Sequence, residues 1–185
     1  MGPRVEGDFT RFVLRPFPTS GTYRNLLAHR EGVLHVTDDA LLIARAALGA
    51  VDPLPAMRPA EKVKGFVLVD ACRHFEFAVR SIDASGERVR IEAEVVQMGW
   101  HRDFWGFNRA KHAVVEAAIL ATRMHLIPHA EIAAEFLKLR VIVTKTGGPA
   151  EFEAMDFLDA RLQAARGFAI AQPEIHGDTR DEDSR

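Results

Sequence analysis

The sequence contains a single cysteine, Cys72, among 185 residues. One thiol cannot form an intramolecular disulfide or assemble a thiolate metal site, so a reducing compartment fits best. No stretch approaches the roughly 20 consecutive apolar residues that cross a bilayer, and the N-terminus lacks the apolar core of a secretory signal. We therefore expect a cytoplasmic protein without a membrane partner.

An excess of charge of one sign is also absent. The 24 Lys and Arg residues nearly balance the 26 Asp and Glu residues, which gives a formal net charge of -2. Nucleic acids and anionic membranes attract proteins through a surplus of basic groups, so this balance favours neither partner. With 48% hydrophobic and 27% charged residues, the composition is that of a globular protein long enough to bury a core.

Several catalytic motifs are missing. There is no Gly-x-Gly-x-x-Gly run and no phosphate loop ending in Gly-Lys-Ser/Thr, which disfavours Rossmann and nucleotide-hydrolase folds. Cys72 has neither a glycine elbow nor a clear base beside it. His125 and His129 are four residues apart, but Pro128 between them disfavours a shared helical face. We assign no metal ligand and no catalytic residue.

The other histidines and the paired acids suggest no chemistry. Four histidines are scattered singly: His29, His35, His74 and His101. A lone histidine is more often a surface or satisfied core residue than a ligand, and none stands out as an axial haem ligand. Asp38-Asp39 begins a predicted helix, where acids are favoured, and Glu92/Glu94 lies on the wet face of a predicted strand, so neither pair receives an acid–base role.

Alternating apolar and charged residues predict antiparallel strands in the first half of the chain. The pattern is clearest at 75–80 and 88–96, where one strand face is buried and the other is wet. Shorter strands are expected at 10–15, 32–36 and 65–69, and helices at 22–29 and 38–48. The proline-rich segment 49–60 excludes a long regular element and is predicted to be a surface connection. These elements favour an antiparallel barrel or curled sheet.

Helical periodicity begins at Asn108. An alanine-rich apolar stripe from Ala110 to Met124 predicts a helix that stops before Pro128. Further helices are expected at 130–144 and 151–165, although the β-branched run Val141-Ile142-Val143 favours an earlier end for the first of them. Residues 176–185 have almost no apolar side chains and are predicted to be disordered.

The most informative stretch is Thr-Ser-Gly-Thr-Tyr-Arg-Asn at 19–25, between a predicted strand and a helix. The hydroxyls of Thr19, Ser20 and Thr22 stand where a helix leaves its first N–H groups unpaired. With Arg24 alongside, this arrangement suits a phosphate. The same residues also make an ordinary N-cap with a solvated Arg24. Local sequence leaves both interpretations open.

A second dense stretch, residues 100–112, combines aromatic, basic and amide side chains where the sheet ends and the helices begin. It suits the floor of a pocket for a planar ring, or a structural junction whose charged groups face water. Four polar residues at its helix start exceed what capping needs: Asn108, Arg109, Lys111 and His112.

Long, ordered segments of this sequence resemble the family known as domain of unknown function 447. They include Gly-Phe-Asn-Arg-Ala-Lys-His at 106–112 and the runs 1–5, 11–17, 19–26 and 32–39, and the resemblance extends to about Leu162. The family is similar to FMN-binding split barrels. This implies an α+β fold, an antiparallel split β-barrel of the FMN-binding type in residues 1–104, followed by a C-terminal helical extension in 105–168 and a disordered tail in 169–185.

The resemblance also implies a cofactor, FMN. In split-barrel flavoproteins the segment matching 19–25 holds the FMN phosphate, which makes these cofactor-binding residues: Thr19, Ser20, Thr22, Tyr23, Arg24 and Asn25. Asn108, Arg109 and Lys111 match the family's own helix motif, and we infer that they line a flavin or substrate pocket. The family likeness further implies a homodimer with flavin sites near the subunit interface. Family members normally begin with a further β-hairpin, which we expect to be missing here.

The implied function is an FMN-dependent oxidoreductase. It would pass electrons from a reduced nicotinamide or deazaflavin to a small-molecule acceptor. Because the family is associated with tetrahydromethanopterin-linked one-carbon metabolism, a pterin-related substrate is expected. The alternative is a non-catalytic flavin-binding or dimerisation module, in which the alanine-rich face of residues 110–121 is an interface.

Overall fold

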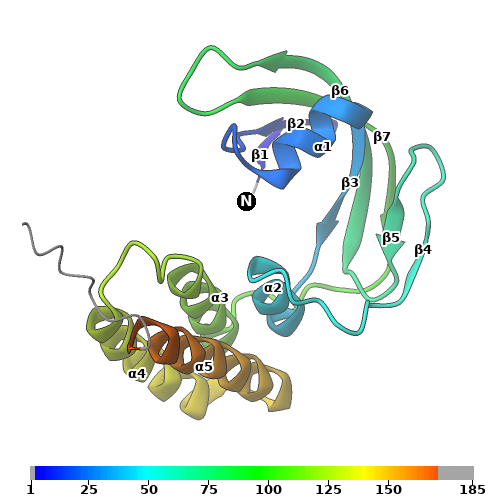
Figure 1. The fold of residues 1–185 in the computed structure, drawn as a ribbon. Coiled ribbons are helices and arrows are strands. Elements are labelled where there is room, and N and C mark those ends of the chain that lie inside the picture. The colour runs from blue at the N-terminus through cyan, green and yellow to red at the C-terminus, as the bar shows by residue number, and fades with distance from the viewer. Residues whose placement is uncertain (1–2, 171–185) are drawn as a thin grey trace, which may run out of the picture. The chain divides into compact units, whose positions relative to one another are not determined.

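A computed structural model describes residues 3–170, without the side chains of 166–170. The chain divides into two compact units (Figure 1). The sheet unit comprises the residues up to 39 and those from 51 to 106, and the helical unit comprises 40–50 and the described residues from 107 onward. Of the predicted disordered tail, residues 169–170 end a helix, and 171–185 lie outside the described residues.

The sheet unit is built on a five-stranded antiparallel sheet of order β1-β2-β7-β6-β3. Its strands are β1 (Arg4–Glu6), β2 (Arg11–Leu14), β3 (Glu31–Val36), β6 (Arg73–Asp83) and β7 (Arg90–Trp100). The predicted antiparallel strands are confirmed. Strand β6 is longer than predicted at both ends, whereas β7 begins two residues later and ends four residues later than predicted. Within residues 3–170 the ladder ends at β1 and β3, so closure into a split barrel stays a prediction.

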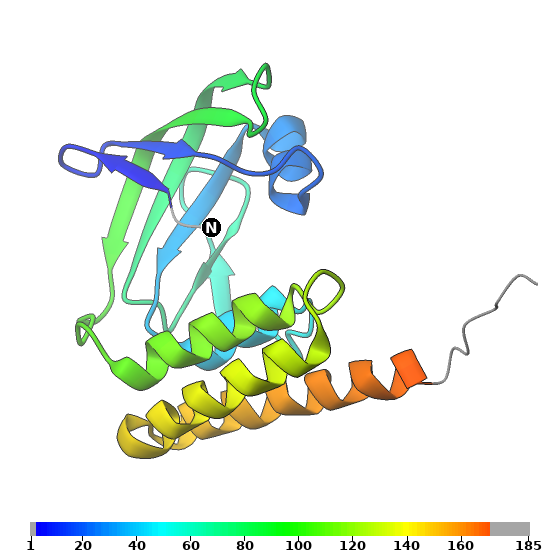
Figure 2. The same cartoon turned by 90° about the vertical axis from the view of Figure 1, so that its left-hand side faces the viewer.

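One face of this sheet carries the apolar core of the unit. Strand alternation puts Phe12 opposite Ala93 and Leu14 opposite Ile91, and all four side chains are buried. Helix α1 (Gly21–His29) lies beside the sheet (Figure 2). Its buried Leu26 belongs to the same core. The apolar alternation of the sequence therefore identifies the core face correctly.

The opposite face of the sheet is partly covered by a small hairpin of β4 (Met57–Pro59) and β5 (Phe66–Leu68). Strand β5 was predicted, but β4 falls in the segment interpreted as a connection. A proline is tolerated there because β4 pairs on one side only, and Pro59 ends the strand. Most of segment 49–60 is irregular, as expected.

The helical unit contains α2 (Ala40–Ala47), α3 (Arg109–Ala121), α4 (His129–Thr146) and α5 (Pro149–Ile170). Helix α4 continues through Val141-Ile142-Val143 because packing outweighs the slightly lower helix propensity of β-branched residues, and Val143 is fully buried. Helix α2 packs against α3 and α5 and therefore belongs to the helical unit. The domain boundary expected from the sequence, between residues 104 and 105, assigns α2 to the sheet domain instead. No described helix is both long and apolar enough to cross a membrane.

Alanine allows these helices to approach closely. Five alanines of α3 are buried: Ala110, Ala113, Ala117, Ala118 and Ala121. They form one core with buried side chains of α2, α4 and α5, among them Phe136 and Leu158. The alanine-rich face therefore packs inside the helical unit, which leaves it little surface for a subunit interface.

Ala117→Leu should destabilise the helical unit by about 1–3 kcal/mol, because a fully buried alanine has no room for three more carbons. Urea unfolding followed by the helical circular dichroism signal measures this change. The matched control is Glu116→Leu, which adds the same residue at the exposed neighbouring position. Equal unfolding midpoints for the two variants would show that the Ala117 site is not tightly packed.

Candidate functional site

The start of α1 is a well-formed N-cap. Ser20 Oγ accepts a hydrogen bond from the Tyr23 N–H at 3.2 Å and donates one to the Phe17 carbonyl at 2.8 Å. Arg24 is exposed, and its Nη1 donates to the Thr19 carbonyl at 2.8 Å. The capping interpretation is confirmed for Ser20. The Arg24 guanidinium binds back to the turn that precedes the helix.

Capping leaves several hydrogen-bond donors at this end unused. Within the described residues, the N–H groups of Gly21 and Thr22 have no hydrogen-bond acceptor. The side chains of Thr19, Thr22 and Asn25 are exposed, and the first turn contains no acid that would repel an anion. The predicted residues are therefore brought together, and their donors remain available for an anion.

The second predicted group has structural partners. Asn108 caps α3, and its Oδ1 accepts the Lys111 N–H at 3.1 Å. Lys111 Nζ lies 3.0 Å from Glu151 Oε1, and Glu151 Oε2 accepts the Gly148 N–H at 2.8 Å. Burial alone would raise the pKa of Glu151, but the Gly148 N–H and the Lys111 ammonium outweigh burial and lower it.

These contacts join the starts of α3 and α5. Arg109 and His112 are exposed, and the ring of Phe107 lies 5.7 Å from that of His112. A structural role thus accounts for Asn108 and Lys111. Their place in a flavin pocket, and that of Arg109, stays a prediction.

Three of the paired acids, Asp38, Glu92 and Glu94, have basic or thiol partners. Glu94 lies 2.6 Å from Arg80, and Glu92 lies 2.9 Å from Arg90, on the solvent side of β7. Asp38 Oδ1 lies 2.5 Å from Arg102 Nη2 and also accepts from the Cys72 thiol at 3.7 Å. Burial, followed by the Asp38 charge, raises the pKa of Cys72, which argues against a thiolate nucleophile.

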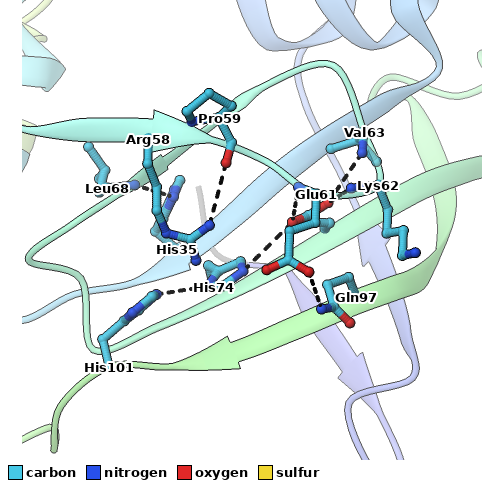
Figure 3. Close-up of polar contacts among 11 residues, drawn as sticks. His35, Arg58, Pro59, Glu61, Lys62, Val63, Leu68, His74, Gln97 and His101 are labelled. Carbon is cyan, nitrogen blue, oxygen red and sulfur yellow. Dashed lines mark hydrogen bonds and ion pairs between the residues drawn. The ribbon is translucent and has the colours of Figure 1, made fainter.

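The sequence interpretation missed a polar cluster, with His74 and Glu76 buried, between the sheet and the β4–β5 hairpin (Figure 3). It contains His35, His74, His101 and Glu76. His35 and His74 are opposite each other across β3 and β6, and His74 Nδ1 lies 2.8 Å from His101 Nε2. Three histidines that stand singly in the sequence are thus brought together.

A signal for this cluster exists in the sequence. His74 and Glu76 are two residues apart on one strand and therefore share a face, while Phe75 and Phe77 occupy the other. The alternation predicts this polar face to be wet. It is buried instead because the hairpin covers it.

Glu76 holds the hairpin in place. Its carboxylate is fully buried and accepts three backbone N–H groups, from Glu61 at 2.9 Å, Lys62 at 2.6 Å and Val63 at 3.2 Å. Burial alone would raise the pKa of Glu76, but these N–H groups and nearby His74 lower it. Glu76 is therefore a buried carboxylate anion.

His35 makes a further contact with the hairpin. Its Nε2 accepts the Leu68 N–H at 3.0 Å, which requires a neutral ring with the proton on Nδ1. Burial, with smaller effects of His74 and His101, lowers the pKa of His35 from 6.5 to about 4. The ring therefore stays a hydrogen-bond acceptor at neutral pH.

His74 is the least satisfied member of the cluster. Only 2% of it is exposed, and its Nε2 has no hydrogen-bond partner among the described residues, although it lies 3.8 Å from Glu76 Oε1. The ring lies against Gly99, where a Cβ would come within 2.2 Å of His74 Cε1. Gly99 is needed because only hydrogen leaves room for this imidazole.

Among residues 3–170, no group of three or more His, Cys, Asp or Glu is placed to hold a metal ion.

Two family models match this chain: "Protein of unknown function (DUF447) N-terminal domain" over residues 1–102 and "Protein of unknown function (DUF447)" over residues 108–159. This protein belongs to the DUF447 family. The predicted family resemblance is confirmed. No curated protein matches the chain.

One of the solved structures that match this chain shares its fold over most of its length. The FMN-bound DUF447 protein MM1853 from Methanosarcina mazei is 22% identical, with a TM-score of 0.74 over 86% of this chain and 85% of that one. The Streptomyces globisporus NADH:FAD oxidoreductase SgcE6 is 13% identical, with a TM-score of 0.42 over 49% and 58%. An FMN-binding protein from Thermus thermophilus is 16% identical, with a TM-score of 0.43 over 52% and 58%.

Glu76→Ala should destabilise the sheet unit by at least about 3 kcal/mol, because three backbone N–H groups would lose a charged acceptor. Hydrogen exchange at residues 61–63 should accelerate together with this loss. Glu94→Ala is the matched control, since it removes the same side chain from an exposed ion pair of β7 and should leave stability nearly unchanged. Similar losses in the two variants would contradict the anchoring role of Glu76.

His35 should make stability depend on pH. The unfolded chain binds a proton near pH 6.5 and the folded one only near pH 4, so stability falls as pH falls through that window, by at most about 1.4 kcal/mol per pH unit. His35→Gln keeps an acceptor for Leu68 but cannot titrate, so its stability should fall less steeply. Urea unfolding between pH 7 and 4.5 measures this difference, with exposed His125→Gln as control. Parallel curves for wild type and His35→Gln would refute it.

Proposed function

We propose that this DUF447 protein binds FMN, with the phosphate at the start of α1, and acts as a flavin-dependent oxidoreductase. The observation that carries the proposal is the set of unused donors at that helix start, on the fold shared with FMN-bound MM1853. The electron donor would be a reduced nicotinamide or deazaflavin, and the acceptor a small molecule, pterin-related in our proposal.

The residues present fit a phosphate. Among the described residues, the N–H groups of Gly21 and Thr22 are unpaired at the positive end of the helix dipole, and the side chains of Thr19 and Thr22 are exposed. Ser20 supports this arrangement indirectly, because its cap bond holds the first turn in shape. Arg24, held by the Thr19 carbonyl, adds positive charge without an acidic partner in the first turn.

FMN, when bound, supplies the hydride chemistry. The chain would contribute the phosphate contacts and an oriented binding surface. Asn25, one turn into α1 and exposed, would donate its amide to the ligand. Tyr23 is half-buried and packs against the sheet core, so its contribution is to hold the helix.

Thr22→Ala/Asn25→Ala should weaken FMN binding at least tenfold, because phosphate contacts are lost, while leaving riboflavin binding unchanged. Titration of the protein with each ligand, followed by flavin fluorescence, measures both affinities. Ser20→Ala is an informative second variant, since it should cost about 1 kcal/mol of stability through the lost cap.

Thr144→Ala is the matched control for this experiment, because it changes a threonine of α4 whose hydroxyl donates to the Arg140 carbonyl of its own helix. Wild-type protein that binds FMN and riboflavin equally well would overturn the phosphate site. Protein that binds neither would overturn the cofactor proposal.

A non-catalytic module is the second candidate. Helix α4 exposes Leu137 and Val141, 70% and 52% accessible and one turn apart, which favours a protein contact such as a homodimer. Adding reduced nicotinamide or reduced deazaflavin anaerobically separates the two functions. Bleaching of bound flavin supports the oxidoreductase, and flavin that stays oxidised with every donor supports the module.

A further inference from the structure

The His74–His101 pair has two possible proton arrangements. In one, His74 donates from Nδ1 to His101 Nε2; in the other, His101 donates from Nε2 to His74 Nδ1. The two arrangements differ in what His74 Nε2 presents to Glu76. In the first it is a lone pair, and in the second it is an N–H.

Glu76 decides between them. Its carboxylate lies 3.8 Å from His74 Nε2, and both groups are buried. A lone pair facing a buried anion is repelled, whereas an N–H is attracted, and low dielectric strengthens both effects. The favoured tautomer of His74 therefore has its proton on Nε2, and His74 Nδ1 becomes the acceptor.

The same choice sets the tautomer of His101. Its Nε2 must carry the proton that it donates to His74, so its Nδ1 holds a lone pair. Among the described residues nothing occupies this nitrogen, and His101 is exposed at the end of β7. We propose that His101 is a general base, oriented by His74 and Glu76, for ligands that carry a weakly acidic N–H or O–H group.

The proton transfer balances in atoms and charge. The ligand's N–H or O–H bond breaks, its electron pair stays on the ligand, and the proton joins His101 Nδ1. The proton on His101 Nε2 then passes to His74 Nδ1, which leaves His101 neutral and His74 a cation beside the Glu76 anion. Returning the proton along the same path restores the starting state, so no further reactant is needed.

The surroundings of His74 disfavour its charged form at rest. Burial, followed by the charges of His101 and Arg58, lowers the pKa of His74, and Glu76 and Glu61 oppose this effect. His35 faces the cluster from β3, and Arg58 extends toward His35 and His74 from β4 (Figure 3). Arg58 makes one long hydrogen bond, 3.4 Å to the Pro59 carbonyl, and can add positive charge near a ligand anion.

The arrangement does not depend on the FMN proposal. It uses residues of β3 and β6 and the residue that follows β7, and none from the start of α1. Glu76 and His74 are positioning residues, because they act through His101. Either proposal can therefore fail while the other stands.

Histidine ¹⁵N spectra of the whole, flavin-free protein test the arrangement directly. At pH 7 both His74 and His101 should be in the neutral Nε2–H form. On acidification the ring nitrogens of both residues should shift with a common midpoint, since the proton is shared. A neutral Nδ1–H form of His101, or His101 titrating while His74 stays unchanged, would overturn the proposal.

Acylation by diethyl pyrocarbonate supplies a chemical readout, because this reagent needs an accessible imidazole lone pair. Wild-type His101 should react at least as fast as exposed His125, the internal reference. In Glu76→Gln the tautomer preference weakens, so His101 should react at least threefold more slowly and His125 at its former rate. His101 that is inert in the wild type, or unaffected in a folded Glu76→Gln variant, would contradict the role of the anion.

Discussion

The buried carboxylate of Glu76 is the constraint on which the rest of the sheet unit depends. A carboxylate removed from water needs strong hydrogen bonds, and three backbone N–H groups of residues 61–63 supply them. Those groups belong to the turn of the β4–β5 hairpin. The anion therefore dictates that the hairpin covers the polar face of the sheet, and with it His35 and His74.

Covering that face changes the chemistry of the histidines. In water each would be an ordinary imidazole, but under the hairpin their proton positions are set by neighbours: His35 by the Leu68 N–H and His74 by Glu76. Only a glycine at position 99 leaves room for the His74 ring. The arrangement of the cluster therefore depends on the space left by the backbone as well as on charge. A structural anchor and a candidate proton-transfer site are thus two aspects of one arrangement.

The start of α1 and the start of α3 carry similar sequence signals but have different structural roles. At α1, the cap uses Ser20 and leaves the N–H groups of Gly21 and Thr22 unpaired. At α3, Asn108 caps the helix and Lys111 is committed to Glu151. Polar residues at a helix start indicate a ligand site only when the fold leaves them without partners.

The sequence by itself determined the strands with one apolar face, the alanine-rich helix and the family. These features are local, because periodicities of two and 3.6 residues and contiguous motifs can be found without knowing what lies nearby. Only the tertiary structure decided that α2 packs with the later helices and that β4 forms. It also brought His35, His74 and His101 together through strand pairing. The hairpin that covers this cluster binds Glu76 through Glu61, which is 15 residues away in the sequence. Such contacts depend on which chain segments are adjacent in space, and residue type and spacing alone do not specify that adjacency.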